Sequence, residues 1–192
     1  MVQAGGVARQ RRPSGNRRVL NKIRENLQIV TVNTPNTLNR DVARQQVRQV
    51  LREILGDEEL VSSPGQPIRM ARQGSTTGIS VSHEAGLSLV AVNYAGPVGI
   101  DLMRPLASAD WFEQILVLAH DYLGPENAQG LACLPAEAQM QHFAERWTEH
   151  EARLKYLGLG LEEWQPALAQ RFSACRVEQL VLPSGYIGAV AY

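Results

Sequence analysis

The sequence has little of several features that define whole classes of protein. Its 192 residues include two cysteines, Cys133 and Cys175, which lie too far apart for a metal knuckle or a disulfide framework and fit a reducing compartment. Lysine plus arginine equals aspartate plus glutamate at 19 each, so no overall charge favours nucleic acid or a membrane surface. No apolar run reaches the length of a signal-peptide core or a membrane span. We therefore expect a soluble cytoplasmic protein.

Charge is unbalanced only near the amino terminus. Five arginines and no acidic residue lie between Arg9 and Arg18, in a stretch rich in Gly, Ser and Pro. Because residues 1–21 show no hydrophobic periodicity, they are predicted to form a disordered basic arm. Arginine tracts bind phosphate backbones, but a short arm without interleaved aromatic residues is more typical of a solvated tail. Nucleic-acid binding is therefore the weaker interpretation.

The rest of the chain predicts a mixture of strands and helices. Alternating or β-branched segments predict strands at 28–34, 79–82, 87–94, 98–103, 172–182 and 186–192. Helices are predicted at 39–55, 109–122 and 135–157, the last with Pro135 at its start and Gly158 just beyond its end. Turn-forming residues predict a loop at 62–67 and a hairpin turn at 83–86.

The order of these elements suggests an α+β fold with two pseudo-symmetric lobes. A strand, a helix and a hairpin are followed by a strand, helices and a second hairpin. Each lobe is expected to be a small, mainly antiparallel sheet packed on helices. After the arm at 1–21, the amino-terminal lobe is expected at 22–97 and the carboxy-terminal lobe at 98–192.

Three residues on the longest predicted helix could share one face. Trp147, Glu151 and Lys155 are spaced four apart. Alone, Glu151 and Lys155 fit an ordinary exposed ion pair, worth only about 0.3–0.5 kcal/mol. His150, considered alone, is more typical of a structural or surface residue than of a catalytic one.

Asp101 weakens the interpretation of Glu151 and Lys155 as an ordinary exposed ion pair. It lies in the otherwise apolar segment Val98–Met103, where a buried carboxylate needs a cation or a hydrogen-bond donor. Gly99 permits a close backbone approach. If this strand lies beside the long helix, Asp101 and Glu151 can converge on one divalent ion, since carboxylates and phosphate oxygens commonly hold Mg²⁺. The alternative is that Asp101 caps a turn or pairs with an arginine.

Ser82 and His83 end a predicted strand beside a glycine-containing turn. Their hydroxyl and imidazole can donate hydrogen bonds to a phosphate group. From spacing alone, an ordinary turn serine and a surface histidine are the better interpretation.

The ordered set of segments resembles the 4′-phosphopantetheinyl transferase superfamily, in particular its larger two-lobed type, which activates peptide and polyketide synthetases. The resemblance covers about residues 28 to 192. It rests on an arginine-bearing first helix, a Gly-Lys-Pro-like loop, a strand ending in Ser-His, a Gly-Ile-Asp strand and a Trp-Thr-x-x-Glu-Ala-x-x-Lys helix. These are Asn39–Arg44, Gly65–Pro67, Ile79–His83, Val98–Asp101 and Trp147–Lys155.

The resemblance implies a reaction and roles for particular residues. The chain would transfer the 4′-phosphopantetheine group from coenzyme A to a serine of an apo acyl, peptidyl or aryl carrier protein and release adenosine 3′,5′-bisphosphate. Asp101 and Glu151 would ligate Mg²⁺, with Mn²⁺ as an alternative ion. Glu151 would also deprotonate the carrier serine, directly or through water, and Lys155 would assist the leaving group. Coenzyme A contacts are implied for Arg44, Gln66, Ser82, His83, His150 and Lys155. The active site would lie between the two lobes, and a monomer is expected because both lobes lie in one chain.

Three positions depart from the family pattern. Met103 stands where many members have a second acid, and a thioether is a poor Mg²⁺ ligand. His150 and Gln66 each replace a usual lysine, and the charge of a histidine would depend on pH near neutrality. These departures favour the alternative of a non-catalytic module that binds coenzyme A or a carrier protein on the same fold. Retention of Asp101, Glu151 and Lys155 favours the enzyme.

Overall fold

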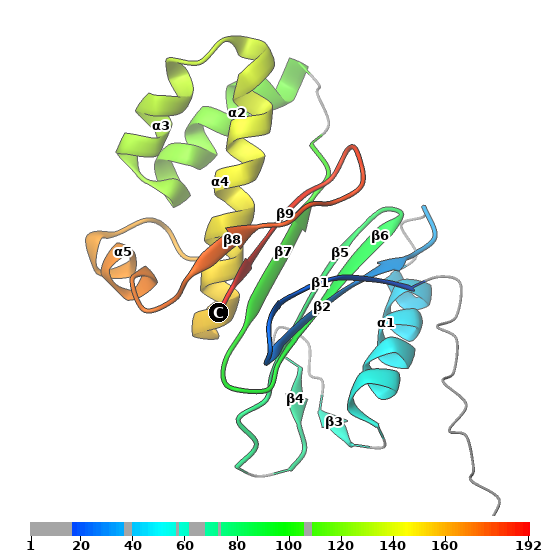
Figure 1. Cartoon of the computed structure of the whole chain (residues 1–192). Helices are drawn as coiled ribbons and strands as arrows, with labels where there is room; N and C mark the ends of the chain where they lie inside the picture. The colour runs from blue at the N-terminus through cyan, green and yellow to red at the C-terminus, as the bar shows by residue number, and fades with distance from the viewer. Residues whose placement is uncertain (1–16, 37–39, 57, 62–67, 73, 106–108) are drawn as a thin grey trace, which may run out of the picture.

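Two antiparallel sheets form the framework of the chain in the computed structural model, which describes residues 17–192 apart from 37–39, 57, 62–67, 73 and 106–108 (Figure 1). The four-stranded sheet contains, in spatial order, β1 (Arg17–Arg24), β2 (Leu27–Asn33), β6 (Leu87–Asn93) and β5 (Gly78–Glu84). The three-stranded sheet contains β7 (Gly99–Met103), β9 (Ile187–Ala191) and β8 (Val177–Gln179). A small separate pair is formed by β3 (Leu60–Val61) and β4 (Arg69–Met70).

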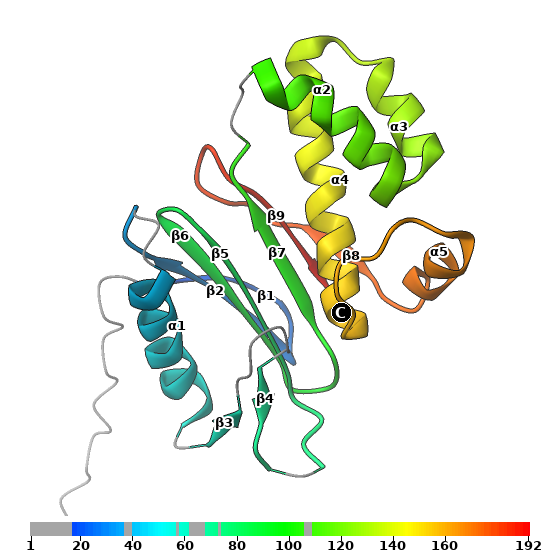
Figure 2. The ribbon, with the colours of Figure 1, turned by 180° about the vertical axis from the view of Figure 1, so that it is seen from behind.

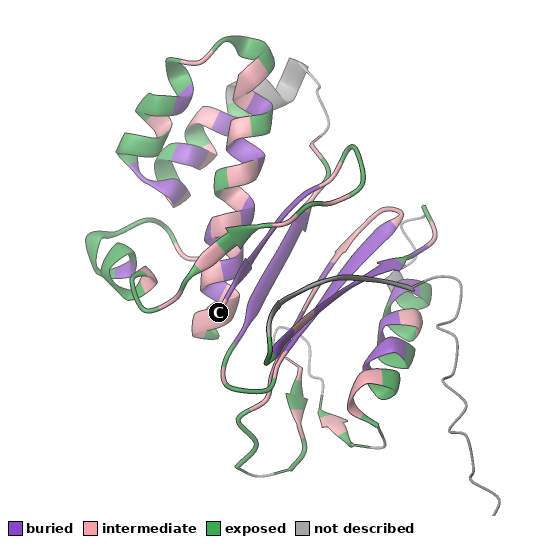
Figure 3. Cartoon of the chain, in the orientation of Figure 1, coloured by how far each residue is buried: buried purple, intermediate pink, exposed green. Residues whose placement is uncertain are grey.

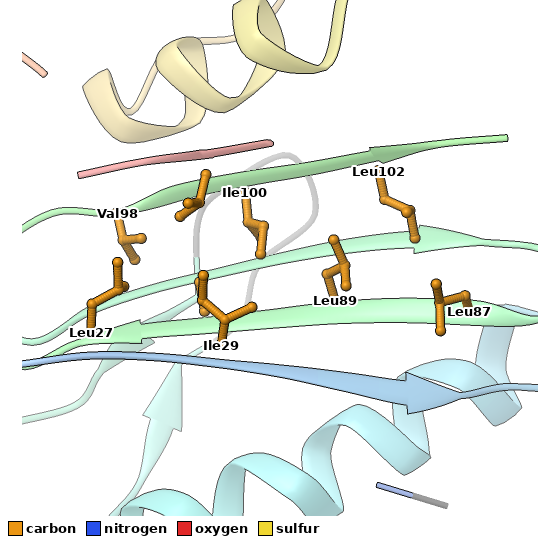
Figure 4. Close-up of a cluster of buried hydrophobic side chains, with 9 residues drawn as sticks. Leu27, Ile29, Leu87, Leu89, Val98, Ile100 and Leu102 are labelled. Atoms are coloured by element: carbon orange, nitrogen blue, oxygen red, sulfur yellow. The ribbon is translucent and has the colours of Figure 1, made fainter. Parts of the chain in front are cut away.

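The four-stranded sheet is buried on both faces because its central strands are apolar at almost every position. Val30, Val32, Val90 and Val92 lie on one face and pack with residues of α1 (Arg40–Leu55). Ile29, Leu89 and Ala91 belong to the other face and pack with Val98 and with residues of β7 and β9 (Figure 4). This second layer joins the two sheets, and β6 and β7 are buried along nearly their whole length (Figure 3).

Helices cover the outer face of the three-stranded sheet (Figure 2). The long helix α4 (Ala136–Leu157) packs on β7 and β9. Against its amino-terminal half lie α2 (Ala109–Leu118), the π-helix η1 (Ala119–Leu123) and α3 (Pro125–Ala132), with Ile115, Leu131 and Phe143 in their shared core. The short helix α5 (Pro166–Phe172) lies near the carboxy-terminal half of α4.

Gly99 allows β7 and α4 to approach closely. A Cβ atom at this position would lie 1.9 Å from the Ala152 carbonyl oxygen and 2.5 Å from the Tyr156 backbone nitrogen. Both atoms belong to backbone and cannot swing aside as a side-chain end can. The absence of a side chain at Gly99 therefore sets the distance between the strand with Asp101 and the helix with Glu151 and Lys155.

The α+β class and most predicted elements are confirmed. The predicted helices at 39–55 and 135–157 match α1 and α4 within one residue, and Gly158 ends α4 with a left-handed φ of 69°. The pseudo-symmetry of the lobes and their boundary at residue 97 stay predictions.

Three predictions about elements are wrong. The disordered arm was expected to reach residue 21, but β1 begins at Arg17, because the open edge of β2 pairs with it through backbone groups. His83 and Glu84 belong to β5, which leaves Ala85 and Gly86 as the turn. The predicted strand 172–182 begins at the last residue of α5, a helix held in place by the buried Leu168, and contains only the short strand β8. In addition, α3 was not predicted.

In the part of the chain that the structure describes, none of the helices combines the length and apolar character needed to cross a bilayer.

Gly99→Ala should lower the free energy of unfolding by about 1–3 kcal/mol or more, since the added methyl group meets backbone atoms of α4. Urea unfolding measures the change. Gly160→Ala is the matched control, because a Cβ atom at Gly160 meets nothing within 4 Å. Equal stability of the two variants would contradict the close packing.

Candidate active site

An ion pair connects β7 to α4 at the centre of the candidate site. Lys155 Nζ lies 2.6 Å from Asp101 Oδ1 and also donates a hydrogen bond of 3.1 Å to the Ile100 carbonyl oxygen. Asp101 is 7% exposed, so its carboxylate needs these partners. The ammonium group of Lys155 is thus held at two points of one strand.

Ser82 supplies a second partner to the same carboxylate from the other sheet. Its hydroxyl donates to Asp101 Oδ1 at 2.9 Å and accepts the Leu102 N–H at 3.2 Å. A serine hydroxyl has a single proton. In this arrangement that proton is donated to Asp101, so Ser82 holds the carboxylate in place, and its contact with a coenzyme A phosphate stays a prediction.

Glu151 lies one helical turn before Lys155 on α4. Its pKa is raised above the ordinary 4.5, first by burial and second by the negative charge of Asp101, while Lys155 opposes the shift. The mutual repulsion of Asp101 and Glu151 is what a bound divalent cation would relieve. These two carboxylates therefore fit a magnesium ion that takes its remaining ligands from water and phosphate oxygens.

No third protein ligand joins them among the described residues, which contain no group of three or more His, Cys, Asp and Glu side chains able to hold a metal ion. Met103 is half-buried and packs against the apolar cluster around Ile115 and Phe143. Its thioether thus belongs to the core between β7 and α2, where many relatives are expected to have an acid.

Two of the remaining predicted contacts for coenzyme A, His83 and Arg44, lie on different elements of the fold. His83 lies on the opposite face of β5 from Ser82, as strand alternation requires, with its Nδ1 2.8 Å from Ser88 Oγ in a hydrogen bond. Arg44 lies on α1, where its largely exposed side chain is 3.4 Å from Asp41. Gln66 lies outside the described residues. The structure groups Ser82, Asp101, Glu151 and Lys155 and leaves His83 and Arg44 outside that group.

His150 lies on a different face of α4 from Glu151 and Lys155. It is 4% exposed and lies in an aromatic cluster, with ring centroids 6.3 Å from Trp147 and 5.3 Å from Phe172. Together with Arg146, Arg153 and residues of α3 and α5, it lines a cavity of about 510 Å³. Burial, and second the charge of Arg153, lower the pKa of His150 to about 4.

The expectation that His150 changes charge near neutrality is therefore wrong. Its imidazole is neutral at pH 7 because an imidazolium ion would be buried beside Arg153. Consequently, His150 does not replace the positive charge of the lysine usual at this position.

Sequence reasoning missed Ser80, whose hydroxyl accepts the Ile100 N–H at 3.0 Å. The signal was present in the alternation of Ser80 and Ser82 with the apolar residues Ile79 and Val81, which puts the two serines on one face of the strand. The sequence could not show which strand the two hydroxyls would contact, because that depends on how the two sheets pack.

Replacing His150 with leucine should reduce the loss of stability in acid. The unfolded chain binds a proton near the ordinary pKa of 6.5, and the folded chain binds it only near 4. Stability is thus lost as pH falls from 6.5 to about 4, by about 3 kcal/mol. Urea unfolding at several pH values measures this loss. Phe143→Leu, at a buried position that does not titrate, should keep the acid loss of the original chain, and an equal loss in His150→Leu would contradict the assignment.

Replacing Glu151 with glutamine should raise stability at pH 7 in the metal-free protein, because the folded state penalises the ionised carboxylate. The folded chain binds the proton more tightly than the unfolded chain. The advantage of the variant should therefore shrink as pH falls through the raised pKa toward 4.5. Thermal unfolding in the presence of a chelator tests this, and a less stable variant at pH 7 would contradict it.

Comparison with known proteins agrees with this geometry. Residues 97–184, which contain Asp101, Glu151 and Lys155, match the sequence profile of the 4′-phosphopantetheinyl transferase superfamily. The chain is also 33% identical over 168 residues to the 4′-phosphopantetheinyl transferase HetI of Nostoc sp. (strain PCC 7120), with 75% of this chain and 68% of that protein covered. The chain belongs to the 4′-phosphopantetheinyl transferase superfamily.

Proposed function

We propose that this protein transfers the 4′-phosphopantetheine group of coenzyme A to a serine of an apo carrier protein, in a magnesium-dependent reaction. The observation that carries the proposal is the group formed by Asp101, Glu151 and Lys155 where β7 meets α4, with Lys155 Nζ 2.6 Å from Asp101 Oδ1. The proposed acceptors are acyl, peptidyl or aryl carrier domains of peptide and polyketide synthetases. Membership of the family supports phosphopantetheine transfer in general.

In the proposed reaction, the serine oxygen of the carrier attacks the pyrophosphate phosphorus that bears the pantetheine arm. The bond from that phosphorus to the bridging oxygen breaks, and adenosine 3′,5′-bisphosphate leaves with the bridging oxygen. The serine proton passes to Glu151, directly or through one water molecule. Burial and the charge of Asp101 raise the pKa of Glu151, which makes it a stronger base than an exposed glutamate.

Lys155 stabilises the negative charge that develops on the leaving phosphate. Its ammonium group is already held near Asp101, so little reorganisation is needed when the pyrophosphate binds. A magnesium ion held by Asp101 and Glu151, with manganese as an alternative, would supply further neutralisation of the pyrophosphate.

Coenzyme A phosphates have two further proposed contacts, His83 on β5 and Arg44 on α1. Arg44 is mostly exposed and its partner Asp41 belongs to the same helix, so its guanidinium can turn toward a ligand. His150 supplies no positive charge in this proposal, because it is neutral at pH 7. A monomer suffices, since one chain supplies Ser82, Asp101, Glu151 and Lys155.

The alternative function is a binding module without catalysis. It is favoured by the packing of Met103 into the core and by the neutral state of His150. A binding module has no need for the raised pKa of Glu151, which is unfavourable to the folded state at neutral pH. The enzyme therefore explains more of the observed arrangement.

Carrier modification tests the choice directly. We expect the protein, coenzyme A and Mg²⁺ to add one phosphopantetheine group to an apo carrier, as measured by intact-mass spectrometry, and we expect a chelator to stop the reaction. Glu151→Gln should lower the rate by about 10²- to 10⁴-fold, because it removes the general base. Asp101→Ala should lower it at least as far.

Glu145→Gln is the matched control for this experiment. Glu145 lies on the same helix, and its carboxylate accepts a hydrogen bond from exposed Gln141, away from β7. Its rate should equal that of the original chain. Absence of carrier modification across acyl, peptidyl and aryl carriers, with coenzyme A still bound, would favour the binding module.

A further inference from the structure

The outer edge of β7 is covered by side chains rather than by another strand. In an antiparallel pair, alternate residues direct both backbone groups away from the partner strand. Ile100 shows this arrangement: its N–H donates to Ser80 Oγ at 3.0 Å and its carbonyl oxygen accepts Lys155 Nζ at 3.1 Å. Ser80 and Lys155 thus bind the two outward groups of one residue, from different elements of the fold.

Ser80 is well placed to hold Ile100 in position. It is 8% exposed and lies on β5, whose pairing with β6 fixes its backbone. Without the hydroxyl oxygen, the Ile100 N–H would lose its acceptor at a buried edge, which is unfavourable. Asp101 follows Ile100 directly, so movement of Ile100 would shift both points that hold the Lys155 ammonium.

We propose that Ser80 is a positioning residue for Lys155. Its hydroxyl fixes the backbone N–H of Ile100 and thereby the position of this residue, so that the Ile100 carbonyl and the Asp101 carboxylate keep the ammonium group in place. Among the described residues, Ser80 makes no hydrogen bond to a charged group of the site. The effect on catalysis rests on the proposed function, while the effect on Lys155 in the free protein does not.

The position of the Lys155 ammonium group can be tested by NMR, because the sequence has two lysines, Lys22 and Lys155. Protein labelled with ¹⁵N-lysine should show a side-chain ammonium signal for Lys155, which the variant Lys155→Met assigns. Ser80→Cys replaces the hydroxyl with a weak acceptor of similar shape, and it should shift or broaden this signal at constant pH. Ser80→Thr restores an acceptor and should return the signal toward its original position.

Ile79→Val is the control for general weakening of β5. Ile79 is the neighbour of Ser80 but belongs to the apolar layer that packs with α1. It should lower the melting temperature while leaving the Lys155 signal unchanged. Ser80→Ala is included as well, and the cysteine and threonine variants keep the test valid if the alanine variant does not fold.

The test of function is a double-mutant cycle measured by single-turnover carrier modification. Ser80→Cys should lower the rate by roughly tenfold, the scale of one lost hydrogen bond, with little change in the KM for the carrier. In the Lys155→Met background, the same substitution should have almost no further effect, because the residue that Ser80 positions is gone.

Two results would overturn the proposal: an unchanged Lys155 signal in Ser80→Cys and Ser80→Ala, or an equal rate loss with and without Lys155. If the original chain modifies no carrier, the proposed function fails, and the ammonium signal alone decides whether Ser80 positions Lys155.

Discussion

The buried outer edge of β7 is the constraint on which the site depends. This strand pairs with β9 on one side only, and its other side faces the interior between the two sheets. Backbone groups at such an edge need partners. Ser80, Ser82 and Lys155 provide them, at 3.0, 3.2 and 3.1 Å. Ser80 and Ser82 therefore join the two sheets, Lys155 joins α4 to β7, and together they define where Asp101 lies.

Two carboxylates of the site, those of Asp101 and Glu151, repel each other, and the fold leaves part of this repulsion in place. Asp101 has a cation and a hydroxyl donor close to its carboxylate. Glu151 is partly buried beside the same carboxylate, and its pKa is raised for that reason. In the proposed reaction, this carboxylate, which is unfavourable to the folded state, is the basic group. This is the usual relation between stability and activity at catalytic sites.

The local features of the sequence were sufficient for many elements and for the main catalytic candidates. Apolar periodicity with Gly158 at its end identified α4, and an acid within an apolar strand identified Asp101. The prediction failed where the outcome depended on a partner in space. The pairing of β1 required the free edge of β2. The helix α5 required a place for Leu168, and the charge of His150 required knowledge of its burial beside Arg153.

By itself, the sequence determined which chemical groups are present and in what order, since residue types and helical spacing are local properties. Together with the resemblance of the ordered segments to one family, these properties indicated Asp101, Glu151 and Lys155 as one set. Only the tertiary structure decided how these groups are used. It turned the Ser82 proton toward Asp101, removed His150 from the charged group and made Ser80 a partner of Ile100. Each of these outcomes arises from contacts between distant segments, and such contacts follow from how sheets and helices pack.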